Sequence, residues 1–454
     1  MPDDQAIKPE PVKVPLVKKP LTVLQTLRKA RQNVLEIIPD ICTKQPMVSG
    51  KTAMVRWHMV MDPEALRRVL KDNLANYPKS DITKNLLRPA IGDSLFIAEG
   101  AHWRWQRRAA APVFSHRNIA ALAPIMSASA EAVCARLAGQ SQADMFDEMV
   151  RATFEVISNV TFSGAGEMAG NEVHQAIDAF IDQSARVSLL DIVGVPTWVP
   201  RPSRLFGGNP VVHMKQVADA AISKRREVGA KPVPDLLDLL LEGMDPETKR
   251  QMNSAELRDN LLTFIVAGHE TTALTLAWAL YLCAFDQSVQ EKLFAEVDSV
   301  LGGRIAGPDD IGNLPFTEQV IKETLRLYPP ASFIARTAQN ADELCGREIK
   351  RKDSVMLPIY ALQRNALLWP DPDSFKPERF AKGATHDRFA WLPFGDGPRV
   401  CIGAHFAMVE AQIILASLIS RYRFEPMEGR SPTPEMVLTL RPKGGVWLNI
   451  TARN

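Results

Sequence analysis

The chain has 454 residues, of which 46% are hydrophobic and 23% charged, an ordinary globular composition without a bias toward disorder. The net charge of +2 gives no strong field that would favour nucleic acid, and the five cysteines include no CxxC pair. This argues against a disulfide scaffold or a zinc ribbon and favours a reducing compartment. A chain of this length can enclose a sizeable cofactor.

The N-terminal part of the chain is expected to be irregular and then to pair as strands. Residues 1–40 are rich in proline and mixed in charge, with neither the apolar core of a signal peptide nor a membrane anchor. Residues 47–62 alternate in polarity as strands do. Helical patterns dominate from Pro63 to Leu327. Predicted loops interrupt them at residues 80–100, 187–210 and 228–235.

Two stretches of this helical region have a possible functional meaning. In "HWRWQRR", Trp103 and Arg107 lie one helical turn apart, so that an indole N–H and a guanidinium could hold one carboxylate. The alternative is a solvated basic helix. Residues 187–210 are apolar but broken by prolines and glycines, which fits either a packed connector or a lid over an apolar pocket.

A long apolar helix is predicted from Asn253, with Glu256 as its capping partner, to Phe285. Its apolar part is long enough to imitate a transmembrane helix, but His269 and Glu270 at its centre would be costly in lipid. We therefore predict the central buried helix of a large soluble protein.

The centre of this helix reads "AGHETT", from Ala267 to Thr272. Gly268 lets a ligand approach the backbone, and a threonine hydroxyl can bond a carbonyl and open the helix. A buried Glu270 needs partners or a use. The pattern fits a kinked helix with a satisfied polar cluster, or a proton-delivery site above a reactive centre.

The pattern changes from Pro329 onward. "SVMLPIYAL" is a strand candidate, proline-rich coil follows through Phe380, and a final helix is predicted from Gly403 to Arg421 before further strand-like segments. The whole chain is thus expected to form one α-rich domain with a minor β region.

Two motifs near this boundary carry charge. "ETLR" places Glu323 and Arg326 on one helical face, which by itself is typical of an ordinary surface ion pair. "PERF" adds Arg379.

The stretch "FGDGPRVCIG", Phe394 to Gly403, places Cys401 just before the final apolar helix. Its glycines permit close approaches of the backbone. The sulfur can then meet backbone N–H groups and the positive end of a helix dipole, which favour a thiolate. With Arg399 two residues away, such a thiolate suits an axial ligand of haem iron. A buried structural cysteine is the alternative.

Together, these stretches make the chain resemble the cytochrome P-450 superfamily of haem-thiolate monooxygenases. A tryptophan–arginine helix, A-G-x-E-T-T, E-x-x-R, P-E-R-F and F-x-x-G-x-R-x-C-x-G occur intact and in this order over residues 103–403. The last motif is highly specific. The residues of "AGHETT" and "PFGDGPRVCIG" are most similar to those of a soluble bacterial member of the AGHETT-type branch. The resemblance implies the cytochrome P-450 fold, with haem b between the long central helix and the cysteine-loop helix, in a single domain over residues 1–454.

The resemblance also implies the roles of individual residues. Cys401 matches the iron ligand, and Phe394 the aromatic residue near the sulfur. The haem propionates are matched by Trp103, Arg107, Arg336 and Arg399. The acid–alcohol pair beside the oxygen site is Glu270 and Thr271. The buried ion-pair triad that supports the fold behind the haem is matched by Glu323, Arg326 and Arg379. The substrate pocket is matched by Thr263, Val266, Ala267, Ala331 and Phe333. Residues 80–100 and 187–210 fall where the family has its entrance and lid.

The activity implied by the resemblance is hydroxylation of a lipophilic small molecule, a fatty acid, terpenoid, steroid or hydrocarbon, with dioxygen and two externally supplied electrons. We expect the electrons from a separate ferredoxin or flavodoxin with its NAD(P)H reductase, in the cytoplasm, without a transmembrane anchor. Arg104, Arg108 and Arg117 would suit an acidic partner, or form a solvated helix face. The alternatives are a peroxide-driven peroxygenase, which the intact Glu270–Thr271 pair disfavours, and a non-enzymatic haem sensor.

Overall fold

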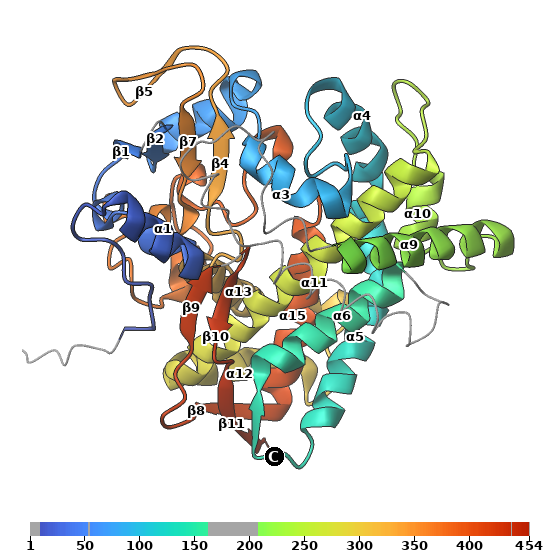
Figure 1. Ribbon diagram of the computed structural model, residues 1–454. Coiled ribbons are helices and arrows are strands. Elements are labelled where there is room, and N and C mark those ends of the chain that lie inside the picture. Colours follow the sequence, from blue (N-terminus) through green and yellow to red (C-terminus); the bar gives the residue numbers. More distant parts are fainter. Residues whose placement is uncertain (1–9, 53–54, 162–207, 437, 454) are drawn as a thin grey trace, which may run out of the picture.

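The structure is a computed structural model that describes residues 10–52, 55–161, 208–436 and 438–453. Within these ranges the chain is mainly helical, with short strands in small sheets, as predicted (Figure 1). The helices are α1 (Val23–Gln32), α2 (Pro63–Arg67), α3 (Asp81–Ile91), α4 (Gly100–Ala110), α5 (His116–Leu137), α6 (Met145–Thr161), α9 (Gly208–Val228), α10 (Leu236–Glu242), α11 (Ser254–Phe285), α12 (Gln287–Leu301), α13 (Pro315–Leu327), α14 (Ile359–Leu362) and α15 (Ala404–Arg421). The strands are β1 (Met47–Thr52), β2 (Val55–Val60), β3 (Gln142–Asp144), β4 (Ile334–Thr337), β5 (Asp342–Leu344), β6 (Arg347–Ile349), β7 (Ser354–Leu357), β8 (Tyr422–Pro426), β9 (Thr433–Met436), β10 (Leu440–Lys443) and β11 (Trp447–Ala452).

Helix α11 crosses the middle of the molecule and packs against α6, α9, α13 and α15 (Figure 1). It begins with the predicted capping box, because the Asn253 side chain accepts from the Glu256 N–H and the Glu256 side chain accepts from the Asn253 N–H. Most of its side chains are buried, and the half-open stretch around Ala267 is an exception. The prediction of a central buried helix is confirmed.

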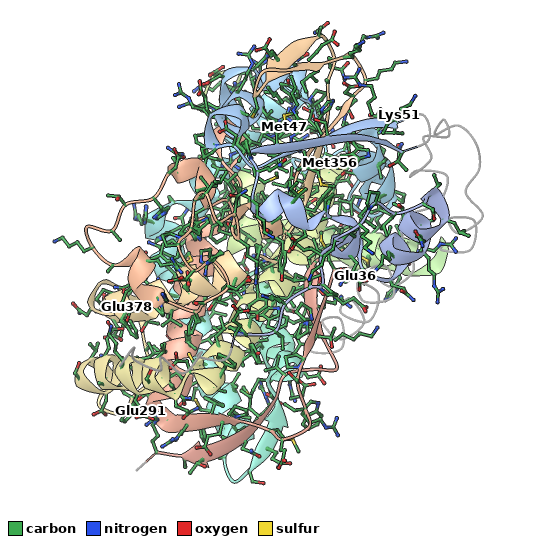
Figure 2. All side chains as sticks on the ribbon, turned by 90° about the vertical axis from the view of Figure 1, so that its left-hand side faces the viewer. Glu36, Met47, Lys51, Glu291, Met356 and Glu378 are labelled. Atoms are coloured by element: carbon green, nitrogen blue, oxygen red, sulfur yellow. The ribbon has the colours of Figure 1, made fainter. Side chains whose placement is uncertain are left out.

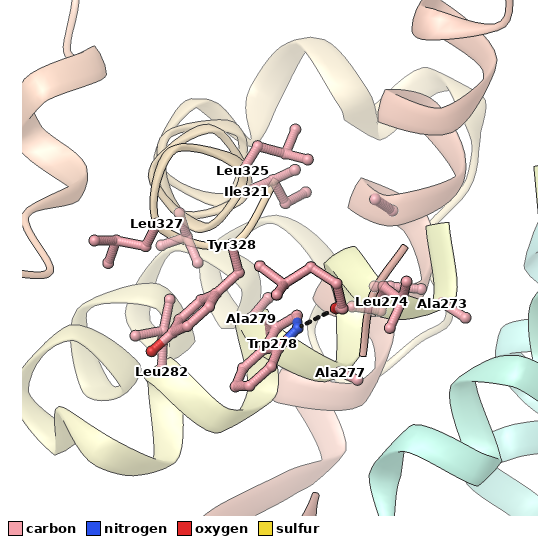
Figure 3. Packing of buried hydrophobic residues seen from close by; sticks show 14 of the residues in the cluster. Ala273, Leu274, Ala277, Trp278, Ala279, Leu282, Ile321, Leu325, Leu327 and Tyr328 are labelled. Atoms are coloured by element: carbon pink, nitrogen blue, oxygen red, sulfur yellow. Dashed lines mark hydrogen bonds between the residues drawn. The ribbon is translucent and has the colours of Figure 1, made fainter. Parts of the chain in front are cut away.

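The C-terminal half of α11 is held in the core through Trp278. Its indole stacks on Tyr328 with ring centroids 4.0 Å apart, and its Nε1–H donates to the Leu440 carbonyl of β10 at 3.0 Å (Figure 3). A buried indole needs such an acceptor for its N–H. These contacts fix the β9–β10 hairpin against α11.

The largest described sheet joins strands near the N-terminus to strands within residues 334–357, in the order β1-β2-β7-β4. Strands β2 and β7 pair in parallel, whereas the other neighbours are antiparallel. Figure 2 shows this sheet near Met47 on β1 and Met356 on β7. The pairing confirms the strands predicted within residues 47–62, and it places β4 beside the segment that precedes α3.

The predicted loop at residues 80–100 is wrong over its first half, which forms α3. The Ser80 side chain accepts from the Thr83 N–H at 3.2 Å and starts the helix, and Leu87, Ala90 and Ile91 are buried. Tertiary burial and a cap therefore outweigh the weak local pattern.

Two other boundary predictions can be compared with the structure. The loop at 228–235 is confirmed between α9 and α10, whereas residues 187–207 lie outside the described residues. The strand predicted over "SVMLPIYAL" is confirmed only for β7, because Ile359–Leu362 after Pro358 form the short helix α14. The final helix is confirmed as α15.

Among the described helices, only α5 is long and apolar enough to cross a bilayer by length and composition. This is weak evidence for a membrane span, because core helices of soluble proteins meet the same criterion. In the structure α5 packs against α6 and α15.

Candidate active site

The loop before α15 is closed around Cys401, whose N–H donates to the Phe394 carbonyl at 2.8 Å. Gly395 and Gly397 have φ angles of 67° and 70°, which favour glycine. A Cβ on Gly397 would lie 2.3 Å from the Leu70 carbonyl oxygen, so a side chain does not fit there. These two glycines are required by the geometry, and they set the position of the sulfur.

Cys401 keeps accessible surface although its thiol lies deep in the fold. Burial raises the pKa of its thiol, and the Gly403 N–H and the Arg107 charge oppose this rise. The expected backbone donor is therefore present, but burial outweighs it. A metal cation bound at the sulfur would favour the thiolate instead.

A cluster of cations lies around one carboxylate beside this loop. Glu99 pairs with Arg399 and accepts from the Lys79 backbone N–H at 2.7 Å. Burial and then the nearby Arg399 lower the pKa of Lys79 to about 7 and that of Arg336 to about 10. The Arg399 guanidinium lies 5.5 Å from the Trp103 ring centroid. The cluster carries more positive than negative charge, so it favours an added anion.

Several buried guanidinium atoms of this cluster have no hydrogen-bond partner. In the described part of the chain they include Nε of Arg336 and both Nε and Nη1 of Arg399. Buried N–H groups without partners are costly, and carboxylates satisfy guanidinium groups well. The residues therefore fit a ligand that brings carboxylates, as the two propionates of haem would.

Replacing Arg336 with glutamine is expected to weaken haem retention by about 10- to 100-fold, because a charge-assisted hydrogen bond contributes about 1.5–3 kcal/mol. The measurement is the transfer of haem from the purified protein to an excess of a haem-binding acceptor. Arg104→Gln, at an exposed position of α4, is the control and should retain haem normally. Equal transfer rates for both variants would contradict the proposed role.

One face of α11 is open at its centre. Ala267 is exposed, and Val266 and Thr271 are half-buried, although the helix on either side is buried. The Thr271 hydroxyl donates to the Ala267 carbonyl at 2.7 Å, one turn back. This places a hydroxyl at the open face, as the predicted oxygen site requires.

Glu270 points away from this face toward the β9–β10 hairpin. Its carboxylate pairs with Arg441 of β10 and accepts from the Thr439 hydroxyl at 3.0 Å. The buried acid has its partners, as the satisfied polar cluster predicts, while the Thr271 hydroxyl lies at the open face, as the proton-delivery site predicts. Two positions further along the helix, the Thr272 hydroxyl meets Glu410 of α15, and burial raises the pKa of Glu410 to about 8.

The structure brings Glu323, Arg326 and Arg379 together. Glu323 and Arg326 are fully buried, with Arg326 Nε 2.7 Å from Glu323 Oε2, and Arg379 Nε lies 3.3 Å from Glu323 Oε1. The other N–H groups of Arg326 donate to the carbonyls of Gln363, Pro372 and Ser374. The pair is therefore a buried ion pair, not a surface one, and it connects α13 to the coil that follows α14.

The predicted substrate-pocket residues differ in accessibility. Thr263 is buried, and its Oγ1 lies 2.7 Å from both the Ser94 hydroxyl and the Asp259 carbonyl. Its hydroxyl is therefore already engaged. Ala331 is exposed and Phe333 half-buried at the edge of the core.

The three arginines expected at a docking face are not equivalent. Arg108 pairs with Asp245 at 2.7 Å and with Glu247 at 3.1 Å, and Arg104 and Arg117 are exposed. The charge of Arg108 is thus compensated within the chain.

Sequence patterns missed residues that distant segments bring to the site. Lys79 joins the cation cluster through its β-bridge with Arg336, and Glu99 joins it by pairing with Arg399. Arg441 joins Glu270 through the β9–β10 hairpin. No local motif marks these positions. Only Arg441 had a signal in the sequence, since a buried Glu270 demands a cation from elsewhere in the chain.

Comparisons with known proteins agree with this geometry. The cytochrome P450 family model matches residues 15–449. Cyclooctatin synthase of Streptomyces melanosporofaciens is 33% identical over 84% of this chain and 83% of its own length. Cyclooctat-9-en-7-ol 5-monooxygenase of the same organism is 31% identical over 87% of this chain and 86% of its own length. A crystal structure of the cytochrome P450DA heme domain gives a TM-score of 0.83 at 24% identity and covers 98% of this chain and 99% of that chain, which supports the fold.

The chain therefore belongs to the cytochrome P450 family, with the cytochrome P450 fold. It is a cytochrome P450 monooxygenase, and membership of this family implies haem, dioxygen and a redox partner.

Proposed function

We propose that the chain is a single haem b domain over residues 1–454 that hydroxylates a lipophilic small molecule in the bacterial cytoplasm. The observation that carries the proposal is the accessible Cys401 beside a cation cluster whose buried Arg336 and Arg399 have N–H groups without partners. Haem, when bound, supplies the oxidation chemistry with dioxygen and two electrons.

The chain holds this group from one side. Cys401 would ligate the iron through its sulfur, to which the Gly403 N–H is bonded, and the Phe394 carbonyl accepts from the Cys401 N–H. The Phe394 ring is proposed to lie near that sulfur. Arg336, Arg399, Trp103 and Arg107 receive the propionates, and we add Lys79 to this set because its ammonium group lies near Arg399. Propionate charges would compensate the lowered pKa values of this cluster. The triad Glu323, Arg326 and Arg379 stabilises the fold behind the cysteine loop.

On the other side, Thr271 and Glu270 supply protons. The Thr271 hydroxyl donates to the Ala267 carbonyl, so its oxygen is free to accept a hydrogen bond at the open face of α11, and Glu270 would supply the proton there through water. Apolar groups around them limit other water.

Replacing Thr271 with alanine is expected to keep substrate binding but to divert electrons to hydrogen peroxide, because the hydroxyl next to the oxygen site is lost. The measurement is product and peroxide formed per NAD(P)H consumed. Thr275→Ala, one turn further along α11, is the control and should couple normally. An unchanged product yield in Thr271→Ala would contradict the relay.

The substrate pocket is proposed to include Val266, Ala267, Ala331 and Phe333, with Thr263 behind them. These groups suit a fatty acid, terpenoid, steroid or hydrocarbon. The relative that acts on cyclooctat-9-en-7-ol makes cyclic alcohols the first compounds to test. A spectral-shift screen of lipophilic compounds tests this, because a compound that enters the pocket would change the absorption of bound haem.

The electrons are proposed to come from a separate ferredoxin or flavodoxin with its NAD(P)H reductase. The exposed Arg104 and Arg117 support this, since they offer positive charge to an acidic partner, whereas Arg108 is already paired.

A further inference from the structure

A pocket of about 830 Å³ opens where α1, the start of α6 and the β9–β10 hairpin meet. We call it the hairpin pocket. Its walls are formed by Arg31, Gln32, Asn33, Glu36, Asp144, Phe146, Asp147, Thr433, Glu435, Arg441, Pro442, Lys443, Gly444 and Gly445. Glu36, labelled in Figure 2, lies in the turn after α1 and marks that side of the pocket. A pocket lined by so many charged and polar groups is a place for water rather than for a lipophilic ligand.

Arg441 belongs both to this wall and to the candidate site. Its guanidinium lines the hairpin pocket and pairs with the carboxylate of Glu270. The Arg441 side chain is 24% exposed and that of Glu270 is 4% exposed. The ion pair therefore forms the contact between solvent and an otherwise buried acid.

The position of Arg441 is fixed by its neighbours. The Leu440 carbonyl accepts from the Trp278 indole, and the Leu440 N–H donates to the Pro330 carbonyl at 3.1 Å. The Thr439 hydroxyl donates to the second oxygen of Glu270. Both carboxylate oxygens of Glu270 are thus turned to the hairpin, away from the open face where Thr271 lies.

We propose that the hairpin pocket supplies the protons for the distal site and that Arg441 is the positioning residue that holds Glu270 at its inner end. The inference rests on the relay proposed above. A water in the pocket gives a proton to the Glu270 carboxylate and takes one back from bulk solvent. Glu270 then passes its proton through water to the Thr271 side and is a carboxylate again. Arg441 stays protonated throughout, so it acts by position and charge.

Other charged groups lie on the elements around Glu270. Asp147 of α6, Glu435 of β9 and Lys443 of β10 line the same pocket, and Glu410 of α15 meets Thr272. Arg441 is the cation that pairs with Glu270 in the described residues. Without it, a buried carboxylate is more stable in its neutral form.

The first test is infrared spectroscopy of the resting protein, which needs no turnover. Arg441→Met is expected to show a new carbonyl band, that of a protonated carboxylic acid. This band should be absent from the double variant that also carries Glu270→Gln. Glu410→Gln identifies the band of Glu410. If Arg441→Met adds no band that depends on Glu270, the positioning role is wrong.

The second test fills the pocket. In the Arg441→Met background, Thr433→Trp on the pocket wall is expected to slow the shift of the Glu270 band after mixing with D₂O at least several-fold. Thr451→Trp, on β11 outside the pocket, is the matched control and should not slow it. Equal exchange in both tryptophan variants would overturn the proposed route.

Peroxide formation separates this inference from the proposed function. With Arg441 intact, Thr433→Trp should raise the share of dioxygen released as peroxide in ferredoxin-driven turnover, as Thr271→Ala does. If only Thr271→Ala raises it, the relay holds but its protons enter elsewhere. If Thr271→Ala has no effect, the relay itself is wrong, whatever the exchange rate of Glu270.

Discussion

Replacing Cys401 with serine is expected to abolish the absorption band that the reduced, carbon monoxide-bound protein shows when a thiolate holds the iron. A serine hydroxyl is far less acidic than a thiol and does not supply the same electron density to the iron. The loop geometry should survive, because Gly395 and Gly397 set its turns. The measurement is the carbon monoxide difference spectrum of the purified, reduced variant.

The control for this change is Cys345→Ser, because Cys345 is the other accessible cysteine in the described residues and lies between β5 and β6. That variant should show the same spectrum as the parent protein. A thiolate band that persists in Cys401→Ser would show that the ligand has been assigned to the wrong residue.

Replacing Arg326 with methionine is expected to lower the free energy of unfolding by about 3–5 kcal/mol, the range for breaking a buried ion pair. The change removes two bonds to Glu323 and the donors to three backbone carbonyls. It leaves the fully buried Glu323 with Arg379 at 3.3 Å and the Lys376 N–H at 2.9 Å. Urea unfolding followed by circular dichroism measures the loss, or expression without soluble protein reveals it.

Lys292→Met provides the matched surface control. Lys292 pairs with Glu378 at 2.7 Å, but both side chains are 55% exposed (Figure 2 labels Glu378). An exposed pair contributes about 0–1 kcal/mol, so this variant should unfold nearly as the parent does. Similar stability losses in the two variants would contradict a special role of the buried triad.

The parts of the fold that could be predicted depend on neighbours in sequence. The capping box of Asn253 and Glu256 and the i, i+3 spacing of Glu323 and Arg326 are local, and each is present as a contact in the structure. The burial of the Glu323–Arg326 pair depends on the whole fold, and the motif alone is typical of an ion pair at the surface. Burial followed only from the resemblance.

The contacts that could not be predicted join distant segments. Lys79 meets Arg336 because a β-bridge pairs their backbones, and Arg441 meets Glu270 because Trp278 and Pro330 anchor β10. Such registers depend on the whole fold. For the same reason α3 was not predicted, because its buried side chains pack against segments that are distant in the sequence.

The two alternative functions differ in what drives product formation. A peroxygenase would turn over with hydrogen peroxide and without a redox partner, and a haem sensor would form no product with either. The "AGHETT" stretch supports the oxygen-dependent reaction, since the Thr271 hydroxyl lies at the open face of α11.

The most direct test is turnover under isotopically labelled dioxygen, with a ferredoxin, its reductase and NAD(P)H, on the compound that gives the largest spectral shift. The account predicts a product with one added oxygen atom that carries the label, and the other atom reduced to water. A product without the label, or product only when peroxide is supplied, would contradict it.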